Sequence, residues 1–154
     1  MRKTTLENLK KRGALCPARV EDGFAQYKNM ILEGHGQQLR LFLEEQVQEN
    51  GWQDSWVDFY YGTLSEAERE KARSVLTEEQ KSWLDGQEIG KQDLYFQMDA
   101  VLFEITYRLS ITGMLFSTYY FTKVPCTVWS SFDGKAVVFG HARTSFTRYV
   151  PDGK

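Results

Sequence analysis

The chain has 154 residues, 42% of them hydrophobic and 14% aromatic, and a formal net charge of −2. This composition predicts one well-packed domain over residues 1–154 without disulfide crosslinks, and it excludes a disordered chain. No apolar run reaches the roughly 18–20 residues of a membrane helix, and no apolar segment follows the charged N-terminus. We therefore expect a soluble, cytoplasmic protein.

The first third of the chain has the apolar spacing of three helices. Thr4 or Thr5 is a suitable cap for a first short helix, which would end at Gly13. Residues 20–32 and 39–47 carry apolar side chains three and four residues apart. This spacing predicts a second and a third helix.

Two capping-box patterns mark the middle of the chain: Ser65 with Glu68, and Thr77 with Gln80. They predict two short helices that begin just after the serine and the threonine. The aromatic-rich stretch before them, residues 52–60, also has helical spacing. It predicts a further short amphipathic helix with a heavy apolar face.

A core helix that leads into a sheet completes the predicted fold. Apolar residues recur every three or four positions from 94 to 109, whereas residues 114–122 have the β-branched and aromatic mixture of a strand. Asp133-Gly134 is the preferred pair for a two-residue hairpin turn, and residues 145–150 add another strand.

These elements together predict an α+β fold in two consecutive parts. A helical part of about residues 4–110, the N-terminal two-thirds of the chain, would pack on a C-terminal antiparallel sheet. The sheet would have three to four strands within about residues 114–150. Both faces of its hairpin are partly apolar, so we expect helices on one face and at least partial cover on the other.

The hairpin leaves two registers open. A two-residue turn at Asp133-Gly134 places Cys126 opposite His141, with Cβ atoms about 4.5–5.5 Å apart. An imidazole beside a thiol favours the thiolate, which is the nucleophile of Cys/His enzymes. A wider turn with a bulge places Cys126 opposite Gly140 instead. Cys126 and His141 are thus a weak candidate catalytic pair, because a buried cysteine usually serves as a small hydrophobe.

Metal and cofactor sites have little support in the sequence. The complete histidine and cysteine content is Cys16, His35, Cys126 and His141, and no two of them have the close spacing of structural zinc modules. Signatures of phosphate-binding loops, dinucleotide-binding turns, zinc proteases and serine hydrolases are also absent. We therefore predict neither a metal site nor any other cofactor.

Charge is distributed unevenly along the chain. Residues 43–104 contain fifteen acidic and five basic side chains, a local balance of −10, whereas each flank carries about +4. The carboxylates that we assign to a candidate acidic face are Glu66, Glu68, Glu70, Glu78 and Glu79. They either solvate one side of the molecule or dock on a basic partner, which would be another protein or a second copy of this chain.

A second candidate binding surface lies near the C-terminus. Arg143 and Arg148 accompany Phe146 on the last expected strand, and basic residues interleaved with aromatic ones suit single-stranded nucleic acid. The alternative is that the aromatic rings belong to the core and the arginines surround it. A basic run at residues 10–12 complements the dipole at the end of the first helix, which explains it without a ligand.

The sequence thus predicts a small intracellular, non-catalytic binding protein that acts through protein–protein contacts, with regulation or inhibition of its partner as the expected role. A nucleic-acid-binding module that uses the C-terminal strands is the alternative. A Cys/His enzyme or a metal site is the third hypothesis. The expected partner is another protein or a second copy, and no membrane partner is expected.

Overall fold

The computed structural model describes residues 1–33, 36–130 and 135–140. In this part of the chain, seven strands form one antiparallel sheet in the order β1-β4-β3-β5-β6-β7-β2. The strands are β1 (Lys3–Thr4), β2 (Lys28–Leu32), β3 (Ser55–Asp58), β4 (Tyr95–Gln97), β5 (Thr118–Phe121), β6 (Cys126–Ser130) and β7 (Ala136–Gly140). The α-helices are α1 (Leu6–Lys11), α2 (Val20–Gln26), α3 (Gln37–Asn50), α4 (Glu66–Arg73), α5 (Glu78–Asp85) and α6 (Ala100–Ile111). Two 3₁₀ helices, η1 (Trp52–Asp54) and η2 (Tyr60–Thr63), flank β3.

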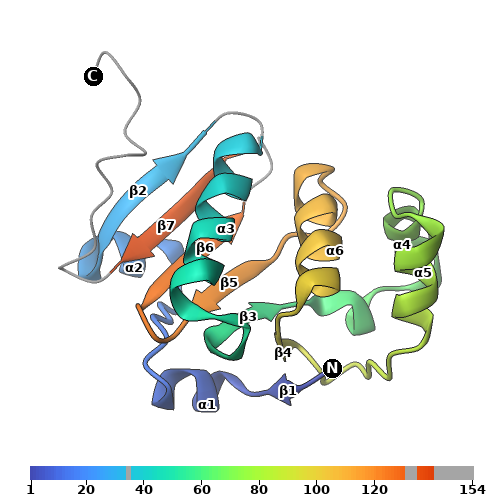
Figure 1. The fold of residues 1–154 in the computed structure, drawn as a ribbon, viewed down its shortest axis with the longest axis horizontal. Coiled ribbons are helices and arrows are strands. Elements are labelled where there is room, and N and C mark those ends of the chain that lie inside the picture. The colour runs from blue at the N-terminus through green and yellow to red at the C-terminus, as the bar shows by residue number, and fades with distance from the viewer. Residues whose placement is uncertain (34–35, 131–134, 141–154) are drawn as a thin grey trace.

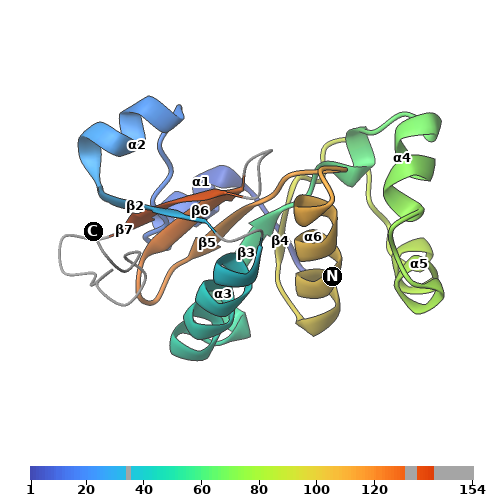
Figure 2. The same ribbon diagram turned by 90° about the horizontal axis from the view of Figure 1, so that it is seen from above.

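The sheet separates two layers of helices (Figure 1). Figure 2 shows α3 and α6 against one face of the sheet, whereas α1 and α2 lie on the opposite face. The α4 and α5 helices form a hairpin beside α6, at one end of the molecule. Among the described residues, no helix is long and apolar enough to cross a membrane.

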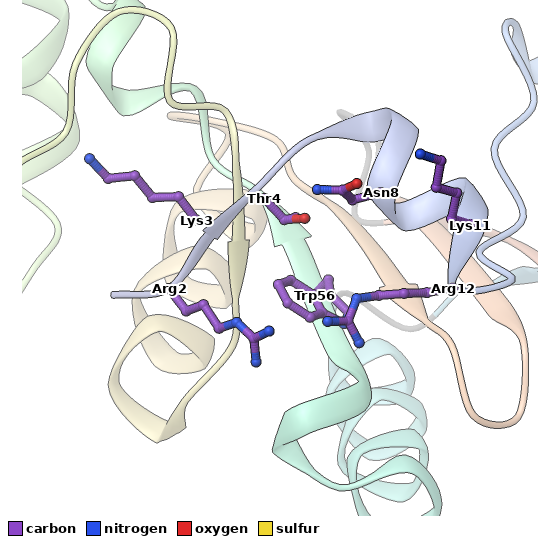
Figure 3. Close-up of a pocket in the computed structure, with 7 residues that line it drawn as sticks. All are labelled: Arg2, Lys3, Thr4, Asn8, Lys11, Arg12 and Trp56. Atoms are coloured by element: carbon purple, nitrogen blue, oxygen red, sulfur yellow. The ribbon is translucent and has the colours of Figure 1, made fainter.

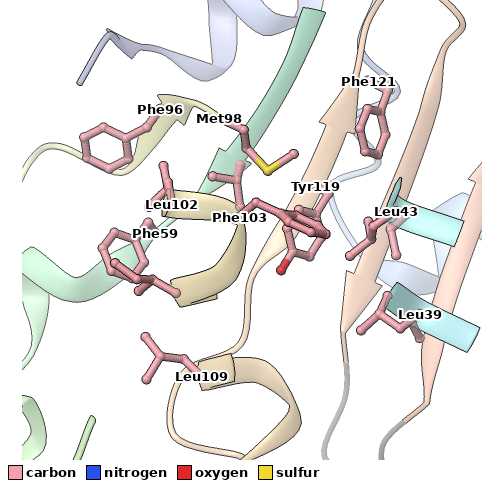
Figure 4. Packing of buried hydrophobic residues seen from close by; sticks show 14 of the residues in the cluster. Leu39, Leu43, Phe59, Phe96, Met98, Leu102, Phe103, Leu109, Tyr119 and Phe121 are labelled. Carbon is pink, nitrogen blue, oxygen red and sulfur yellow. The ribbon is translucent and has the colours of Figure 1, made fainter. Parts of the chain in front are cut away.

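The larger core lies between the sheet and the helices α3 and α6 (Figure 4). Side chains alternate along a strand, so Val57 on β3 and Tyr119 and Phe121 on β5 all point toward this layer. Helix α6 contributes Leu102 and Leu109 from its buried face. Because these side chains have almost no exposed surface, their burial is the main stabilising contribution to this part of the fold.

A second, smaller cluster lies on the opposite face of the sheet. Leu9 of α1 packs there on Trp56 and Tyr120, which are paired neighbours on β3 and β5. Nearby, the Thr127 hydroxyl donates a hydrogen bond to the carbonyl of Leu15, at 2.7 Å. The N-terminal segment is therefore fixed to the sheet by both apolar packing and a hydrogen bond.

The prediction of helices followed by a sheet is wrong in its arrangement, although the α+β class is correct. Helices and strands are interspersed, and four strands come from the first hundred residues: β1, β2, β3 and β4. The predicted helix over 20–32 stops at Gln26, and its second half is β2, which pairs with β7 from Lys28 to Leu32. A long-range strand partner has overridden local helical spacing.

The predicted helix over residues 52–60 is also wrong, for the same reason. Its central residues, Ser55–Asp58, form β3, which pairs with β4 on one side and β5 on the other. All four residues of β3 are buried, so the stretch is apolar because both faces of the strand are covered. Such a run has no clear period, and it can resemble one turn of an apolar helix.

The local capping signals were predicted correctly. Thr5 caps α1, and its side-chain oxygen accepts a hydrogen bond from the Asn8 amide at 3.2 Å. Both capping boxes are present, at Ser65 for α4 and at Thr77 for α5. These signals are reliable because they satisfy backbone groups within a single helical turn.

The α4–α5 hairpin leaves the sheet after β3 and returns at β4 through a narrow neck. The Phe59 amide donates to the Leu94 carbonyl at 2.7 Å, which closes the base of this neck. Further out, a Cβ atom on Gly62 would lie 2.3 Å from the carbonyl oxygen of Gly90. The two backbones can approach so closely only because residue 62 has no side chain.

Replacing Gly62 by alanine is expected to lower the free energy of unfolding by about 1–3 kcal/mol, because the new methyl group would push backbone apart at the neck. Gly86→Ala is the matched control. Residue 86 has helical φ and ψ. A Cβ atom added there would lie 3.4 Å from the Trp83 carbonyl oxygen, an ordinary van der Waals distance. Urea denaturation of both variants measures the difference, and equal stability of the two would contradict the role of the neck.

Candidate functional site

A polar cavity of about 320 Å³ lies where the N-terminal segment crosses β3. Its lining consists of Arg2, Lys3, Thr4, Asn8, Lys11, Arg12 and Trp56 (Figure 3). We call this set the cationic pocket. Four of its seven residues carry a positive charge, and none is a carboxylate. The sign of the lining therefore favours an anionic ligand.

Pairing and capping in the first twelve residues position the cationic pocket. The carbonyl of Arg2 accepts a hydrogen bond from the Gln97 amide at 2.8 Å, which holds the start of the chain on β4. Thr5 then caps α1, and the buried side chain of Leu9 fixes this helix against Trp56. Arg2 precedes these anchors and Arg12 follows them, so the two arginines approach Trp56 from opposite sides (Figure 3).

The two arginines converge on one aromatic ring. The guanidinium carbon of Arg12 lies 4.8 Å from the centroid of the Trp56 ring, and that of Arg2 lies 5.6 Å from it. Each cation–π contact contributes about 0.5–2 kcal/mol, depending on how far the cation is desolvated. Trp56 is only 1% exposed, because Leu9 and Tyr120 pack against it and the two arginines lie over its ring.

Three of the four cations in the cationic pocket have no carboxylate partner in the part of the chain that the structure describes. Lys3 is paired, since its Nζ lies 2.9 Å from Oδ2 of Asp93. Within the described residues, no carboxylate oxygen lies within 4.0 Å of the charged nitrogens of Arg2, Lys11 or Arg12. The like charges of these side chains repel one another. A bound anion would attract each of them and so offset this repulsion.

Trp56 also carries a buried donor. Its Nε1 has no hydrogen-bond partner among the described residues. Leaving a buried donor unpaired costs about 1–3 kcal/mol. Trp56 thus has an unpaired donor, and the cationic pocket has positive charge in excess of the carboxylates that the described residues supply.

Two other cavities, of about 350 and 480 Å³, flank helix α6 and differ from the cationic pocket in their charge balance. Arg40 and Glu104 line both. They form a two-point ion pair, with Nη1 to Oε2 at 3.0 Å and a second contact from Nη2 to Oε1. Because the charges are already compensated, these cavities have no comparable preference for an anion.

A buried carboxyl group lies on the same strand and the same face as Trp56. Asp58 is 8% exposed, and its Oδ1 accepts a hydrogen bond from the Thr118 amide at 2.8 Å. Burial raises the pKa of Asp58 from its ordinary value of 3.8 to about 7, although the hydrogen bonds from Thr118 act in the opposite direction. This side chain therefore exchanges a proton near neutral pH.

The predicted Cys126–His141 pairing rests on the wrong register. Cys126 faces Gly140, and Val128 faces Val138, so the alternative register of the wider turn is correct. The turn itself and His141 lie outside the described residues. Cys126 is buried in the larger core, where burial raises the pKa of its thiol, as does nearby Glu49 to a lesser extent. This environment disfavours the thiolate that catalysis requires.

The two cysteines are free and lie on opposite faces of the sheet. Cys126 belongs to the core beneath α3 and α6, whereas Cys16 packs beside Trp56 and Tyr120. They therefore cannot bind one zinc ion together. The structure describes no group of three or more potential metal ligands, and His35 and His141, the other residues considered for zinc, fall outside its described ranges.

The five glutamates of the candidate acidic face are all exposed on α4 and α5. Glu68 completes a capping box by accepting a hydrogen bond from the Ser65 amide at 2.9 Å. Glu78 pairs with Lys81 of its own helix, at 3.1 Å. These two carboxylates thus have local structural roles, while the contribution of Glu66, Glu70 and Glu79 to binding stays a prediction.

The candidate nucleic-acid residues Arg143, Phe146 and Arg148 lie outside the described residues, so their role also stays a prediction. Sequence reasoning missed the cationic pocket. It assigned Lys11 and Arg12 to the helix dipole and did not connect them with Trp56. The available signal was the density of basic residues in the first twelve positions, but their convergence on β3 depends on long-range pairing.

Comparisons with known proteins do not assign a function to this arrangement. No protein family matches the chain, and no curated protein or solved structure matches it either. The cationic pocket is therefore interpreted from its own chemistry.

Asp58 predicts a pH dependence of stability. The pKa of Asp58 is 3.8 in the unfolded state and about 7 in the folded state. At a pH between these two values, the folded state holds a proton that the unfolded state has released. Stability should therefore fall as the pH rises from 4 to 7, by on the order of 2–4 kcal/mol at about 1.4 kcal/mol per pKa unit. Asp58→Asn should remove this decline and raise stability at pH 7.

Urea denaturation across this pH range tests the prediction, and Asp85→Asn is the control. Asp85 is exposed, and its pKa is lowered by Arg73, so its replacement should leave the decline in place. If Asp58→Asn kept the slope of the unmodified protein, the buried carboxyl would not be its source.

Proposed function

We propose that this chain is a non-catalytic binding protein that recognises an acidic segment of a partner protein through the cationic pocket. The observation that carries the proposal is the convergence of Arg2 and Arg12 on buried Trp56 without a carboxylate partner in the described residues. Arginine forks bind carboxylates and phosphates with two parallel hydrogen bonds. Two such forks lie against one aromatic ring in the cationic pocket.

The chemistry around the pocket supports binding rather than catalysis. Its side chains are arginine, lysine, threonine, asparagine and tryptophan, which donate hydrogen bonds and attract anions. The lining includes no histidine, cysteine or carboxylate that could act as a nucleophile or general base. Recognition of a charged group is the activity that this set of residues can perform.

An acidic protein segment suits the pocket better than a single-stranded nucleic acid does. Nucleic-acid binding of that kind depends on aromatic faces that are open to bases. Trp56 is 1% exposed and has two guanidinium groups over its ring, so a base cannot stack on it. The volume of about 320 Å³ accommodates one anionic group and its side-chain stem.

Removal of the two arginines tests this proposal directly. The unmodified protein should bind a fluorescein-labelled poly-glutamate peptide in an anisotropy titration, and added salt should weaken the complex. Arg2→Ala/Arg12→Ala should weaken binding at least about tenfold, since loss of two charge-assisted contacts costs more than 1.4 kcal/mol. Arg2→Lys/Arg12→Lys keeps the charge without the fork and should give an intermediate affinity.

Arg19→Ala/Lys123→Ala is the charge-matched control, because both side chains are exposed and neither lines the cationic pocket. This variant should bind the peptide like the unmodified protein. A poly-glutamine peptide should not bind any variant. If Arg2→Ala/Arg12→Ala and Arg19→Ala/Lys123→Ala lost the same affinity, net charge and not the pocket would attract the peptide. The proposal would then be abandoned.

A further inference from the structure

We infer that the group recognised by the cationic pocket is a phosphomonoester carried by the partner's peptide chain. This inference rests on the proposed function, because it specifies which anion the same pocket takes. Three observations carry it: the number of uncompensated charges, the geometry of the donors and the size of the cavity.

The charge of the cationic pocket matches a dianion better than a monoanion. With Lys3 paired to Asp93, the remaining cations are Arg2, Lys11 and Arg12. A carboxylate would leave an excess of two positive charges among them. A phosphomonoester carries about −1.5 to −2 charges at pH 7 and would reduce this excess to about one.

The donors also suit a tetrahedral oxyanion. Arg2 and Arg12 flank Trp56 in the pocket, and the Thr4 and Asn8 side chains lie above this ring in the view of Figure 3. A planar carboxylate has two oxygens in one plane, so it can satisfy one guanidinium fork well. A phosphate has three terminal oxygens, so it can accept hydrogen bonds from both arginines and from a neutral side chain at once.

The dimensions of the pocket indicate that the phosphate is attached to a larger chain outside it. A volume of about 320 Å³ is at the lower limit of small-molecule sites. The lining offers no exposed aromatic ring for a base, since Trp56 is covered. The remainder of the ligand must therefore extend along the surface, as a phosphorylated side chain of a peptide would.

Four peptides of one sequence, in anisotropy titrations with the full chain, test this inference. They carry phosphoserine, its methyl phosphodiester, glutamate or serine at the central position. We expect the phosphoserine peptide to bind at least about tenfold more tightly than the glutamate and diester peptides, because only the monoester can become a dianion. Arg2→Ala/Arg12→Ala should reduce its affinity to that of the serine peptide, whereas Arg19→Ala/Lys123→Ala should not.

The outcomes separate the inference from the proposed function. If glutamate and phosphoserine peptides bound equally and both depended on Arg2 and Arg12, the acidic-segment proposal would stand and the phosphate inference would fail. If no peptide bound, both would fail. Competition by inorganic phosphate as effective as that by the phosphopeptide would assign the site to free phosphate, and this would overturn the peptide-borne ligand. Preference for the diester would point to a nucleic-acid backbone and would also overturn it.

Discussion

The structure depends on the burial of both faces of strand β3. Its four residues alternate between two environments: Val57 enters the core beneath α3 and α6, while Trp56 and Asp58 point to the opposite face. An antiparallel sheet can leave one face in water, but a strand with a tryptophan on its second face needs cover there as well. The N-terminal segment supplies this cover, and so the cationic pocket is a consequence of completing the fold.

The N-terminal segment that covers Trp56 also brings the positive charges of Arg2 and Arg12 to one ring, and their mutual repulsion does not stabilise the fold. Leu9 packs on Trp56, and the guanidinium groups of Arg2 and Arg12 lie over its ring, so both kinds of side chain contribute to its cover. Some other arginines of the described residues are compensated by carboxylates, as in the pairs Arg40–Glu104 and Arg73–Asp85. Residues that locally oppose folding are typically retained for binding. The proposed function gives a role to these two arginines, for which the described residues supply no carboxylate partner.

How far the sequence predicts this structure depends on the range of the interactions involved. Ser65 and Thr77 were identified correctly as helix caps, and Thr5 was one of the two caps predicted for the first helix, because each bonds to a backbone group three residues away. Strands β1, β2, β3 and β4 were missed, and β4 lies within the stretch predicted as the start of the core helix, because the partners of these strands are distant in the chain. The Cys126 register was left between two alternatives, since one residue in the turn decides it. The cationic pocket requires all the long-range pairings at once, so local patterns could not reveal it.

The uneven charge of the chain raises the question of whether the partner is a second copy. A contact between the cationic pocket of one molecule and the acidic α4–α5 hairpin of another would join two different surfaces. Such heterologous contacts continue into rings or filaments, because each added copy presents a free surface of each kind. The hairpin also uses Glu68 and Glu78 in bonds of its own. The acidic segment of a different protein, as proposed above, would not be subject to these constraints.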